Sequence, residues 1–333
     1  MRHPPIELHR GELRVTGSPL HLDARRRAGC AFVSHAHGDH IGRHDRTIAT
    51  PATLALMNHR LGEPKRRRQA EHLPAGYRQP FGLGELTLEL FPAGHVLGSA
   101  QLRITFKDGR SVGYTGDLCT DTVQASERAE VMPCQTLVME STFGLPRYVF
   151  PPKAETLERV RRFVDDALSD GVTPVLYAYS LGKAQEILAY LSGLGQACRV
   201  HPVVHAIDRI YEAHGVALPG VRVLDPEAPP AGEVVVVPQQ LAWSPAMRWV
   251  GRRRTAVLTG WALDGSGRFF RGVDAAFPLS DHADHPSLLA YARATGAERV
   301  FTVHGHADEL AAALRKEGIR AQPLREESQL ELL

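Results

Sequence analysis

The 333-residue chain has little cysteine and no long apolar run, and each shortage excludes a class of protein. Its four cysteines, Cys30, Cys119, Cys134 and Cys198, lie far apart and form no paired spacing. This excludes a disulfide framework and a thiolate metal site, so we expect small buried cysteines in a reducing compartment. No stretch is apolar for long enough to cross a bilayer or to serve as a signal peptide. We therefore expect a cytoplasmic protein with no membrane partner.

An excess of one charge is also missing. The chain has 39 lysines and arginines against 37 aspartates and glutamates, a net charge of +2, which neither predicts nor excludes a nucleic-acid partner. Basic residues, all of them arginine except Lys65, do gather at 25–27, 65–68 and 252–254. Arginine suits phosphate oxygens, but for each cluster alone an ordinary solvated surface is the better explanation.

Hydrophobic patterns divide the chain into three parts. The first has short apolar or alternating runs, expected to be strands, at 11–17, 31–33, 85–91, 101–106, 110–116 and 136–140, and one expected helix at 51–61. The second alternates expected helices at 154–171, 183–195 and near 205–214 with expected strands at 174–179, 199–204, 233–238 and 255–261. Such alternation predicts a parallel α/β layer. The third returns to strand–helix units, with a strand at 299–305 and a helix at 307–318.

One short stretch, HAHGDH, places His35, His37, Asp39 and His40 within six positions directly after an apolar run. On an extended backbone the side chains at 35 and 37 project to the same side. Nitrogen and carboxylate ligands without sulfur suit Zn²⁺, with Mn²⁺ or iron as competitors. The pattern predicts a metal site whose remaining ligands come from elsewhere in the chain.

Three isolated residues supply these remaining ligands. His95 and Asp117 stand just past expected strands, and His304 stands at the end of one. A single aspartate at a strand end is more often a turn residue, so each position alone is weak. Together with the HAHGDH stretch they complete a set large enough for two metal ions.

HAHGDH, GHVLGSA and TGDL together resemble the metallo-β-lactamase superfamily of hydrolases. The resemblance implies an α/β fold, an αββα sandwich with two metals at the edge of its packed sheets. It implies that one zinc is held by His35, His37 and His95, and that a second is held by Asp39, His40 and His304. It further implies that Asp117 bridges the two ions and that Asp23, in HLDA, orients ligands from behind them.

Three further motifs, MESTFG with Glu140, LSDHAD with His282 and TVHG with His304, resemble those of the β-CASP nucleases. That branch carries an extra α/β domain inserted after the first of these motifs. The resemblance implies a first metallo-β-lactamase part at 1–145, an inserted β-CASP-like domain at 146–270 and a completing part at 271–333.

ESTFGLPRYVFPP, VLYAYSLGKAQ and PLSDHADHPSLL resemble a narrower group, the bacterial ligase-associated DNA exonucleases. This similarity implies a DNA exonuclease that works in repair with an ATP-dependent DNA ligase and a helicase. His304 favours the alternative, because histidine in the last motif is more typical of RNA-cutting members, whereas Artemis-type DNA nucleases carry valine. An RNA-processing nuclease is therefore the first rival. Two further rivals are weaker. The inserted segment argues against a lactonase or thioesterase, and the full ligand set argues against a non-catalytic scaffold.

A two-metal site activates water against a phosphodiester without a protein nucleophile. Asp39 and Asp117 are candidate catalytic residues as well as expected metal ligands. His282 is the candidate general acid, and Glu140 is the residue that the resemblance places against its ring.

Substrate contacts are expected at a second place. In YAYSLGKAQ, Ser180, Gly182 and Lys183 stand where a strand gives way to a helix, whose N-terminus offers amide hydrogens to a phosphate. Taken alone, the motif favours a tight turn that needs glycine, but together with a metal site it favours phosphate binding. Ser141 and Thr142, next to Glu140, are further candidates for substrate binding. Trp243 and Trp261 are possible base-stacking residues, although an aromatic side chain near an apolar strand more often belongs to the core.

Overall fold

The structure, a computed structural model, describes residues 5–62, 71–121, 124–225, 227–228, 230–264 and 272–326. It has two compact units, the first made of residues 1–120, 127–148 and 282–333, and the second of 121–126 and 149–281. The chain thus enters the second unit after Tyr148 and leaves it before His282, with a short earlier excursion at 121–126. The predicted boundary at 270/271 and the basic cluster at 65–68 lie outside the described residues.

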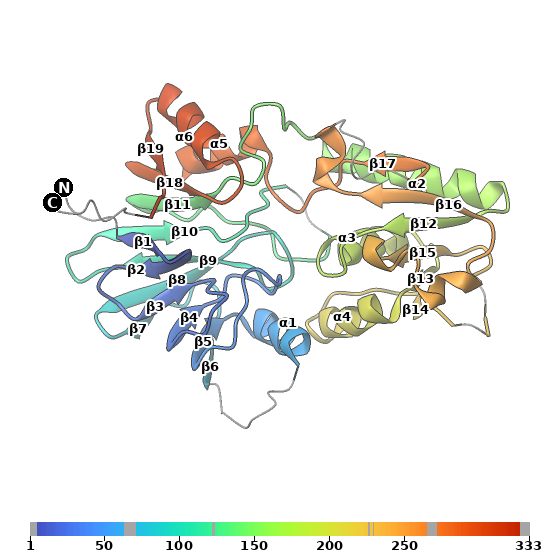
Figure 1. Ribbon diagram of the computed structural model, residues 1–333, viewed down its shortest axis with the longest axis horizontal. Helices are drawn as coiled ribbons and strands as arrows, with labels where there is room; N and C mark the ends of the chain where they lie inside the picture. The colour runs from blue at the N-terminus through green and yellow to red at the C-terminus, as the bar shows by residue number, and fades with distance from the viewer. Residues whose placement is uncertain are drawn as a thin grey trace. The chain divides into compact units, whose positions relative to one another are not determined.

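The first unit is built on two sheets. The first sheet has the order β1 (Ile6–His9), β2 (Glu12–Val15), β3 (Leu20–Leu22), β4 (Cys30–Phe32), β5 (Arg46–Ala49), β6 (Glu71–Pro74). The second has the order β19 (Arg320–Pro323), β18 (Arg299–Val303), β11 (Thr136–Glu140), β10 (Ser111–Tyr114), β9 (Ala100–Thr105), β8 (Leu86–Pro92), β7 (Phe81–Leu83). Helix α1 (Pro51–Leu61) flanks the first sheet, and α5 (His285–Ala294) and α6 (Ala307–Lys316) flank the second (Figure 1).

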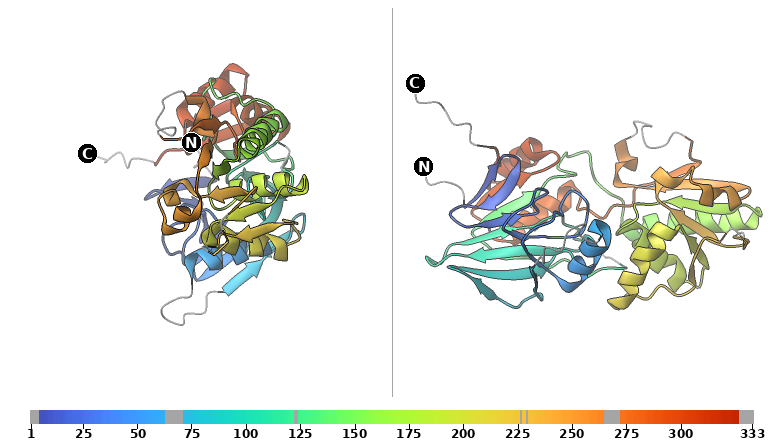
Figure 2. Two further views of the ribbon diagram at one scale, coloured as in Figure 1. Left: turned by 90° about the vertical axis from the view of Figure 1, so that its right-hand side faces the viewer. Right: turned by 60° about the horizontal axis from the view of Figure 1, so that its bottom comes forward.

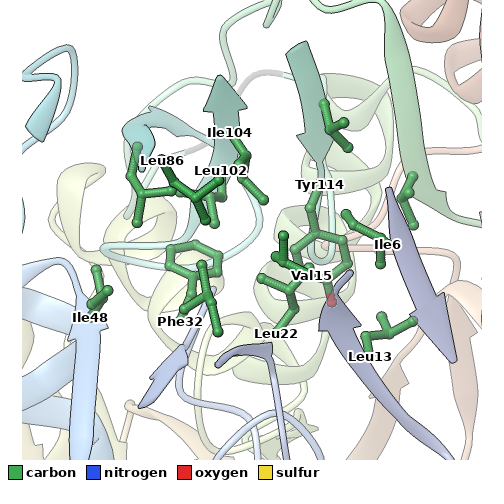
Figure 3. Close-up of a cluster of buried hydrophobic side chains, with 14 of the residues drawn as sticks. Ile6, Leu13, Val15, Leu22, Phe32, Ile48, Leu86, Leu102, Ile104 and Tyr114 are labelled. Carbon is green, nitrogen blue, oxygen red and sulfur yellow. The ribbon is translucent and has the colours of Figure 1, made fainter. Parts of the chain in front are cut away.

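Two apolar layers hold this unit together. Between the sheets, Phe32 and Leu22 face Leu102 and Ile104, and all four are almost fully buried (Figure 3). A second cluster joins the other face of the second sheet to α5 and α6. The alternation of buried and less buried residues along β8 is that of a strand with one face in a core. The unit is therefore the predicted αββα sandwich.

The second unit holds a six-stranded parallel sheet. Its order is β14 (Val221–Val223), β13 (Cys198–Val200), β15 (Val234–Val237), β12 (Thr173–Tyr177), β16 (Arg253–Leu258), β17 (Ala275–Phe277). Its helices are α2 (Lys153–Ser169), α3 (Lys183–Gly193) and α4 (Pro202–Ala213), seen from two further directions in Figure 2. All four residues of β15 are buried, as expected for a parallel strand covered on both faces. The sheet is the predicted parallel α/β layer.

Strand direction in the first unit decides where the polar motifs meet. Strands β10, β11 and β18 run parallel to one another, and β8 runs the same way because β9 is antiparallel to both β8 and β10. Their carboxyl ends therefore share one edge of the sheet. His95, Asp117, Glu140 and His304 all lie at or just beyond these ends.

The described residues include no helix with the length and apolar character needed to traverse a bilayer. All four cysteines are buried, as the sequence predicts.

Candidate metal centre

The loop after β4 carries the first group of histidines. The Val33 amide donates to the Ile48 carbonyl at 2.9 Å, and the Ser34 carbonyl accepts from the Ala100 amide at 2.8 Å. These bonds tie the loop to β5 on one side and to β9 of the opposite sheet on the other. His35 and His37, which follow at once, are buried. The backbone thus fixes where the imidazoles point.

Four predicted ligands converge in this structure. His35, His37, His95 and Asp117 each offer a ligand atom, and these atoms lie within 4.8 Å of one another. Asp117 Oδ2 is 3.4 Å from His35 Nε2 and 3.6 Å from His95 Nε2. His95 Nε2 is also 3.0 Å from His37 Nδ1. Three imidazoles and one carboxylate on a single small volume form the donor set of a zinc-type site.

The protonation of the cluster also fits a metal. His35 Nε2 is buried and has no hydrogen-bond partner among the residues that the structure describes. Burial, with His40 and His95 nearby, lowers the pKa of His35 well below its usual value, so its imidazole is neutral and offers a lone pair. A buried nitrogen without a partner is costly unless something binds it. The residues present therefore fit a bound cation.

His40 belongs to a second, adjoining group. Its Nε2 lies 3.5 Å from Asp117 Oδ2, and its Nδ1 lies 2.9 Å from Asp23 Oδ2. Burial alone would lower the pKa of His40, but the charges of Asp117 and Asp23 raise it to about 10. Asp39 has a side chain that is 71% exposed, with Oδ2 3.8 Å from His40 Nε2. The exposed His304 has its ring centroid 6.0 Å from that of His40. The second set of ligands is thus near but not gathered, and it stays a prediction.

Asp23 forms hydrogen bonds behind the predicted ligands and contacts His40 directly. Its carboxylate accepts hydrogen bonds from the Ser34 amide and hydroxyl, both at 2.6 Å, and from the Tyr114 hydroxyl at 2.8 Å. With His40 these make a buried network around one carboxylate. Sequence reasoning missed Ser34 and Tyr114. Tyr114 is the last residue of β10, and nothing in its sequence surroundings indicated a contact with Asp23.

A second pair lies at the edge of the cluster. His282 Nδ1 is 3.1 Å from each carboxylate oxygen of Glu140, and His282 Nε2 is 4.0 Å from Asp117 Oδ2. Glu140 is fully buried and also accepts from the Leu118 amide at 2.6 Å. Burial would raise the pKa of Glu140, but the charge and hydrogen bond of His282 lower it. The carboxylate fixes the ring so that Nε2 faces the metal ligands.

Comparison with known proteins agrees with this geometry. Residues 6–162 match a family described as a β-lactamase superfamily domain, and residues 275–322 match a Zn-dependent metallo-hydrolase RNA specificity domain. Together the two matches cover more than half of the chain. The chain belongs to the β-CASP branch of the metallo-β-lactamase superfamily. The sequence prediction of both fold and family is confirmed.

Several known proteins are similar to this chain. A probable DNA ligase of Opitutus terrae is 40% identical over 93% of the chain, which spans only 30% of that protein. RNase aCSPSF2 of Saccharolobus solfataricus is 26% identical over 48% of the chain and 37% of its own length. An RNase J-like protein of Methanocaldococcus jannaschii is 22% identical over 82% of the chain and 80% of its own length. A solved Enterococcus faecalis protein of unknown function shares the fold, with a TM-score of 0.65 and 14% identity over 90% of the chain and 80% of that protein.

Ser141 and Thr142, two of the predicted substrate residues, make hydrogen bonds within the first unit. The Ser141 hydroxyl donates to the Val303 carbonyl at 2.9 Å, which joins the ends of β11 and β18. The Thr142 amide donates to Glu140 Oε2 at 3.3 Å. Both residues therefore support the Glu140 turn, and their contact with substrate stays a prediction.

The remaining predicted substrate residues lie at the start of α3. The Gly182 amide donates to Gln185 Oε1 at 2.8 Å, and Lys183 Nζ lies 2.5 Å from Asp281 Oδ1. Ser180 contributes its carbonyl, which accepts from Gln185 Nε2 at 3.1 Å. Gly182 has φ of +95°, a backbone angle that favours glycine at this turn, and a phosphate site here stays a prediction.

The expectation that Trp243 belongs to the core is wrong. Its side chain is 90% exposed, because it lies between the 3₁₀ helices η1 (Gln239–Leu241) and η2 (Pro245–Trp249), outside the sheet. Trp261, in the 3₁₀ helix η3 (Gly260–Asp264), is half-buried.

Proposed function

We propose that the protein is a metal-dependent DNA exonuclease with two bound zinc ions, working in repair beside an ATP-dependent DNA ligase and a helicase. The observation that carries the proposal is a four-ligand cluster with a histidine, His282, held beside it by Glu140. A nucleophilic serine or cysteine is not needed for hydrolysis at such a site. A cytoplasmic location, as expected from the sequence, belongs to the same proposal.

The ligands divide into two sets around Asp117. His35, His37 and His95 would hold one ion, and Asp39, His40 and His304 the other, with Mn²⁺ as a substitute for zinc. Bound metal supplies activation of a water molecule and neutralisation of charge on the phosphodiester. The rigid loop anchored on β5 and β9 keeps the first set in place, while Asp23 fixes the ring of His40.

His282 is the proposed proton donor to the departing oxygen. Glu140 binds its Nδ1, which leaves Nε2 as the ring atom on the side of Asp117. Glu140 thus orients the ring so that Nε2 is the atom from which a general acid would give up its proton.

DNA is the preferred substrate, and RNA is the alternative. The similarity to a probable DNA ligase supports DNA and a ligase partner. The match to an RNA specificity domain and the similarity to archaeal RNases favour RNA.

End-labelled single-stranded DNA and RNA of one sequence, with and without a 5′-phosphate, test the proposal in Zn²⁺ or Mn²⁺. We expect DNA to be shortened from an end by the wild-type protein and to remain intact with Asp117→Ala. Faster cleavage of RNA than of DNA would replace the DNA assignment with the alternative. No cleavage of either polymer by metal-loaded protein would refute the nuclease assignment.

A further inference from the structure

Trp243 contributes little burial energy to the folded chain. Its indole is 90% exposed, although burying a tryptophan normally removes a large apolar area from water. The neighbouring Trp249 is half-buried. An exposed indole of this kind is available for contact with a partner, and tryptophan is enriched at interfaces.

The charged residues that surround Trp243 in the sequence are all positive. From Gln239 to Arg254 the chain has arginines at 248, 252, 253 and 254 and no aspartate or glutamate. Arg248 and Arg252 are exposed, and within the described part of the chain their guanidinium groups make neither a hydrogen bond nor an ion pair; Arg252 is bonded only through its carbonyl, which accepts from the Thr173 amide at 3.0 Å. Two positive charges whose side chains have no partner in the described structure thus lie within nine residues of Trp243 in the sequence.

The other two arginines help to hold this stretch. Arg253 Nη1 donates to the Met247 carbonyl at 3.3 Å, which fastens η2 to the start of β16. Arg254 pairs with Asp170 at 2.6 Å. Met247 and Val250 are buried in the core of the second unit. The buried Met247 and Val250 therefore hold the segment on the core. Trp243, Arg248 and Arg252 are exposed to solvent.

We propose that residues 239–254 form a binding site for single-stranded nucleic acid, in which Trp243 stacks on a base and Arg248 and Arg252 contact phosphates. Every nucleobase offers a π-face to an indole, and arginine forks pair with phosphate oxygens. A duplex hides its bases, so the indole recognises unpaired nucleotides. The absence of acidic residues from the stretch matches a polyanion. The inference rests on the proposed nuclease function and specifies how that function would grip its substrate.

Binding is measured with the full-length Asp117→Ala protein and a fluorescein-labelled oligothymidine by anisotropy, so that cleavage does not intervene. We expect Trp243→Ala to weaken binding about 5- to 100-fold, and Trp243→Phe to weaken it less because phenylalanine still stacks. Leu194→Ala is the matched control, since Leu194 is another exposed apolar side chain of the second unit, at 59%, and should leave the affinity unchanged. Tryptophan fluorescence should be quenched by oligothymidine, and the quenching should largely disappear in Trp243→Ala.

The arginines are tested by salt. Replacing Arg248 and Arg252 with glutamine should lower the slope of log affinity against log salt by about 1 to 2, because each phosphate contact releases counterions. Trp243→Ala should affect duplex DNA by less than about twofold.

An affinity for oligothymidine that is unchanged in Trp243→Ala overturns the inference and points to a protein partner for this surface. The proposed function is judged separately by hydrolysis of bis(4-nitrophenyl) phosphate by metal-loaded wild-type protein. Failure of that reaction would count against the nuclease while the binding result would still decide the role of Trp243.

Discussion

The carboxylate of Asp23 accepts hydrogen bonds from Ser34 and Tyr114 and contacts His40, so a single side chain connects both packed sheets to a predicted metal ligand. In Figure 3 Tyr114 stands among the apolar side chains of the core, with its hydroxyl oxygen drawn in red. Residues behind the ligands of a metal site commonly set its affinity.

Asp23→Asn should weaken zinc binding about 10- to 100-fold, because an amide nitrogen in place of Oδ2 donates hydrogen bonds and can accept from neither His40 nor the Ser34 hydroxyl. Competition with a chelator measures the affinity directly. Tyr114→Phe, which removes one donor and keeps the ring in the core, should have a smaller effect in the same direction. An Asp23→Asn protein that binds zinc as tightly as the wild type would show that this network has no part in holding the metal.

His282→Ala should retain the metal and lose activity by about 10²- to 10⁴-fold, the usual contribution of a general acid. Metal content by atomic emission and the rate of phosphodiester hydrolysis are measured on the same preparation. Glu140→Gln should lower the rate less, since glutamine still bonds the ring. Loss of zinc from His282→Ala would make His282 a ligand instead.

At the scale of elements, the turn after β10 brings two sheets into very close approach. Gly116 has φ of +55°, and a Cβ there would lie 2.5 Å from the Cβ of Ser34. The turn thus depends on glycine both for its backbone angle and for space.

Gly116→Ala should destabilise the protein by about 2–4 kcal/mol, combining the cost of a left-handed backbone angle with that of an overlap in a packed region. Gly109→Ala separates the two effects, because Gly109 has φ of +81° and open space around it. It should cost only about 1 kcal/mol. Equal losses for both variants in urea unfolding would contradict the close approach.

Helices α3 and α4 meet at a buried acid. Asp208 Oδ1 accepts from Gln185 Nε2 at 2.8 Å, while Oδ2 has no partner among the described residues. Burial raises the pKa of Asp208 to about 7. Between about pH 4 and 7 the unfolded chain has lost this proton and the folded chain keeps it, so the folded state loses stability as the pH rises.

Asp208→Asn removes this titration and should therefore gain stability relative to the wild type as the pH rises. We expect the difference in free energy of unfolding to grow by about 2 kcal/mol in favour of the variant between pH 5.5 and pH 8. Urea titrations at the two pH values measure it, with the exposed Asp166→Asn on α2 as the comparison. A difference between Asp208→Asn and wild type that stays constant with pH would disprove the buried-acid explanation.

The sequence predicts elements best where pattern and punctuation agree. Helix α1 occupies the predicted 51–61 because Thr50 caps it and Pro51 begins it. Strands β6 and β14 were missed, because β6 is wholly exposed and β14 has only three residues, so neither shows a buried alternation. Among site residues, those at strand ends were predictable from their spacing. Ser34 and Tyr114 were not, because their role comes from two sheets meeting in space.

At the scale of the whole molecule, the two units divide the proposed labour. Every predicted metal ligand lies in the first unit, and Trp243 and the α3 turn lie in the second. Metal should therefore stabilise the units unequally. An ion present at 100 times its dissociation constant adds about 2.7 kcal/mol to the unit that binds it.

Removal of metal should thus accelerate amide hydrogen exchange in peptides from β4, β8, β10 and β18, while peptides from β12 and β15 should change little. Mass spectrometry of the wild-type protein with zinc and with chelator gives both values at once. Equal deprotection of both units would contradict a metal site confined to the first.

The central claim is that side chains from separate strand ends bind a pair of metal ions, and anomalous diffraction at the zinc edge tests it most directly. The account predicts one peak among His35, His37, His95 and Asp117, and a second on the other side of Asp117 beside His40. Crystals grown in zinc that show no peak within coordination distance of Asp117 would contradict it.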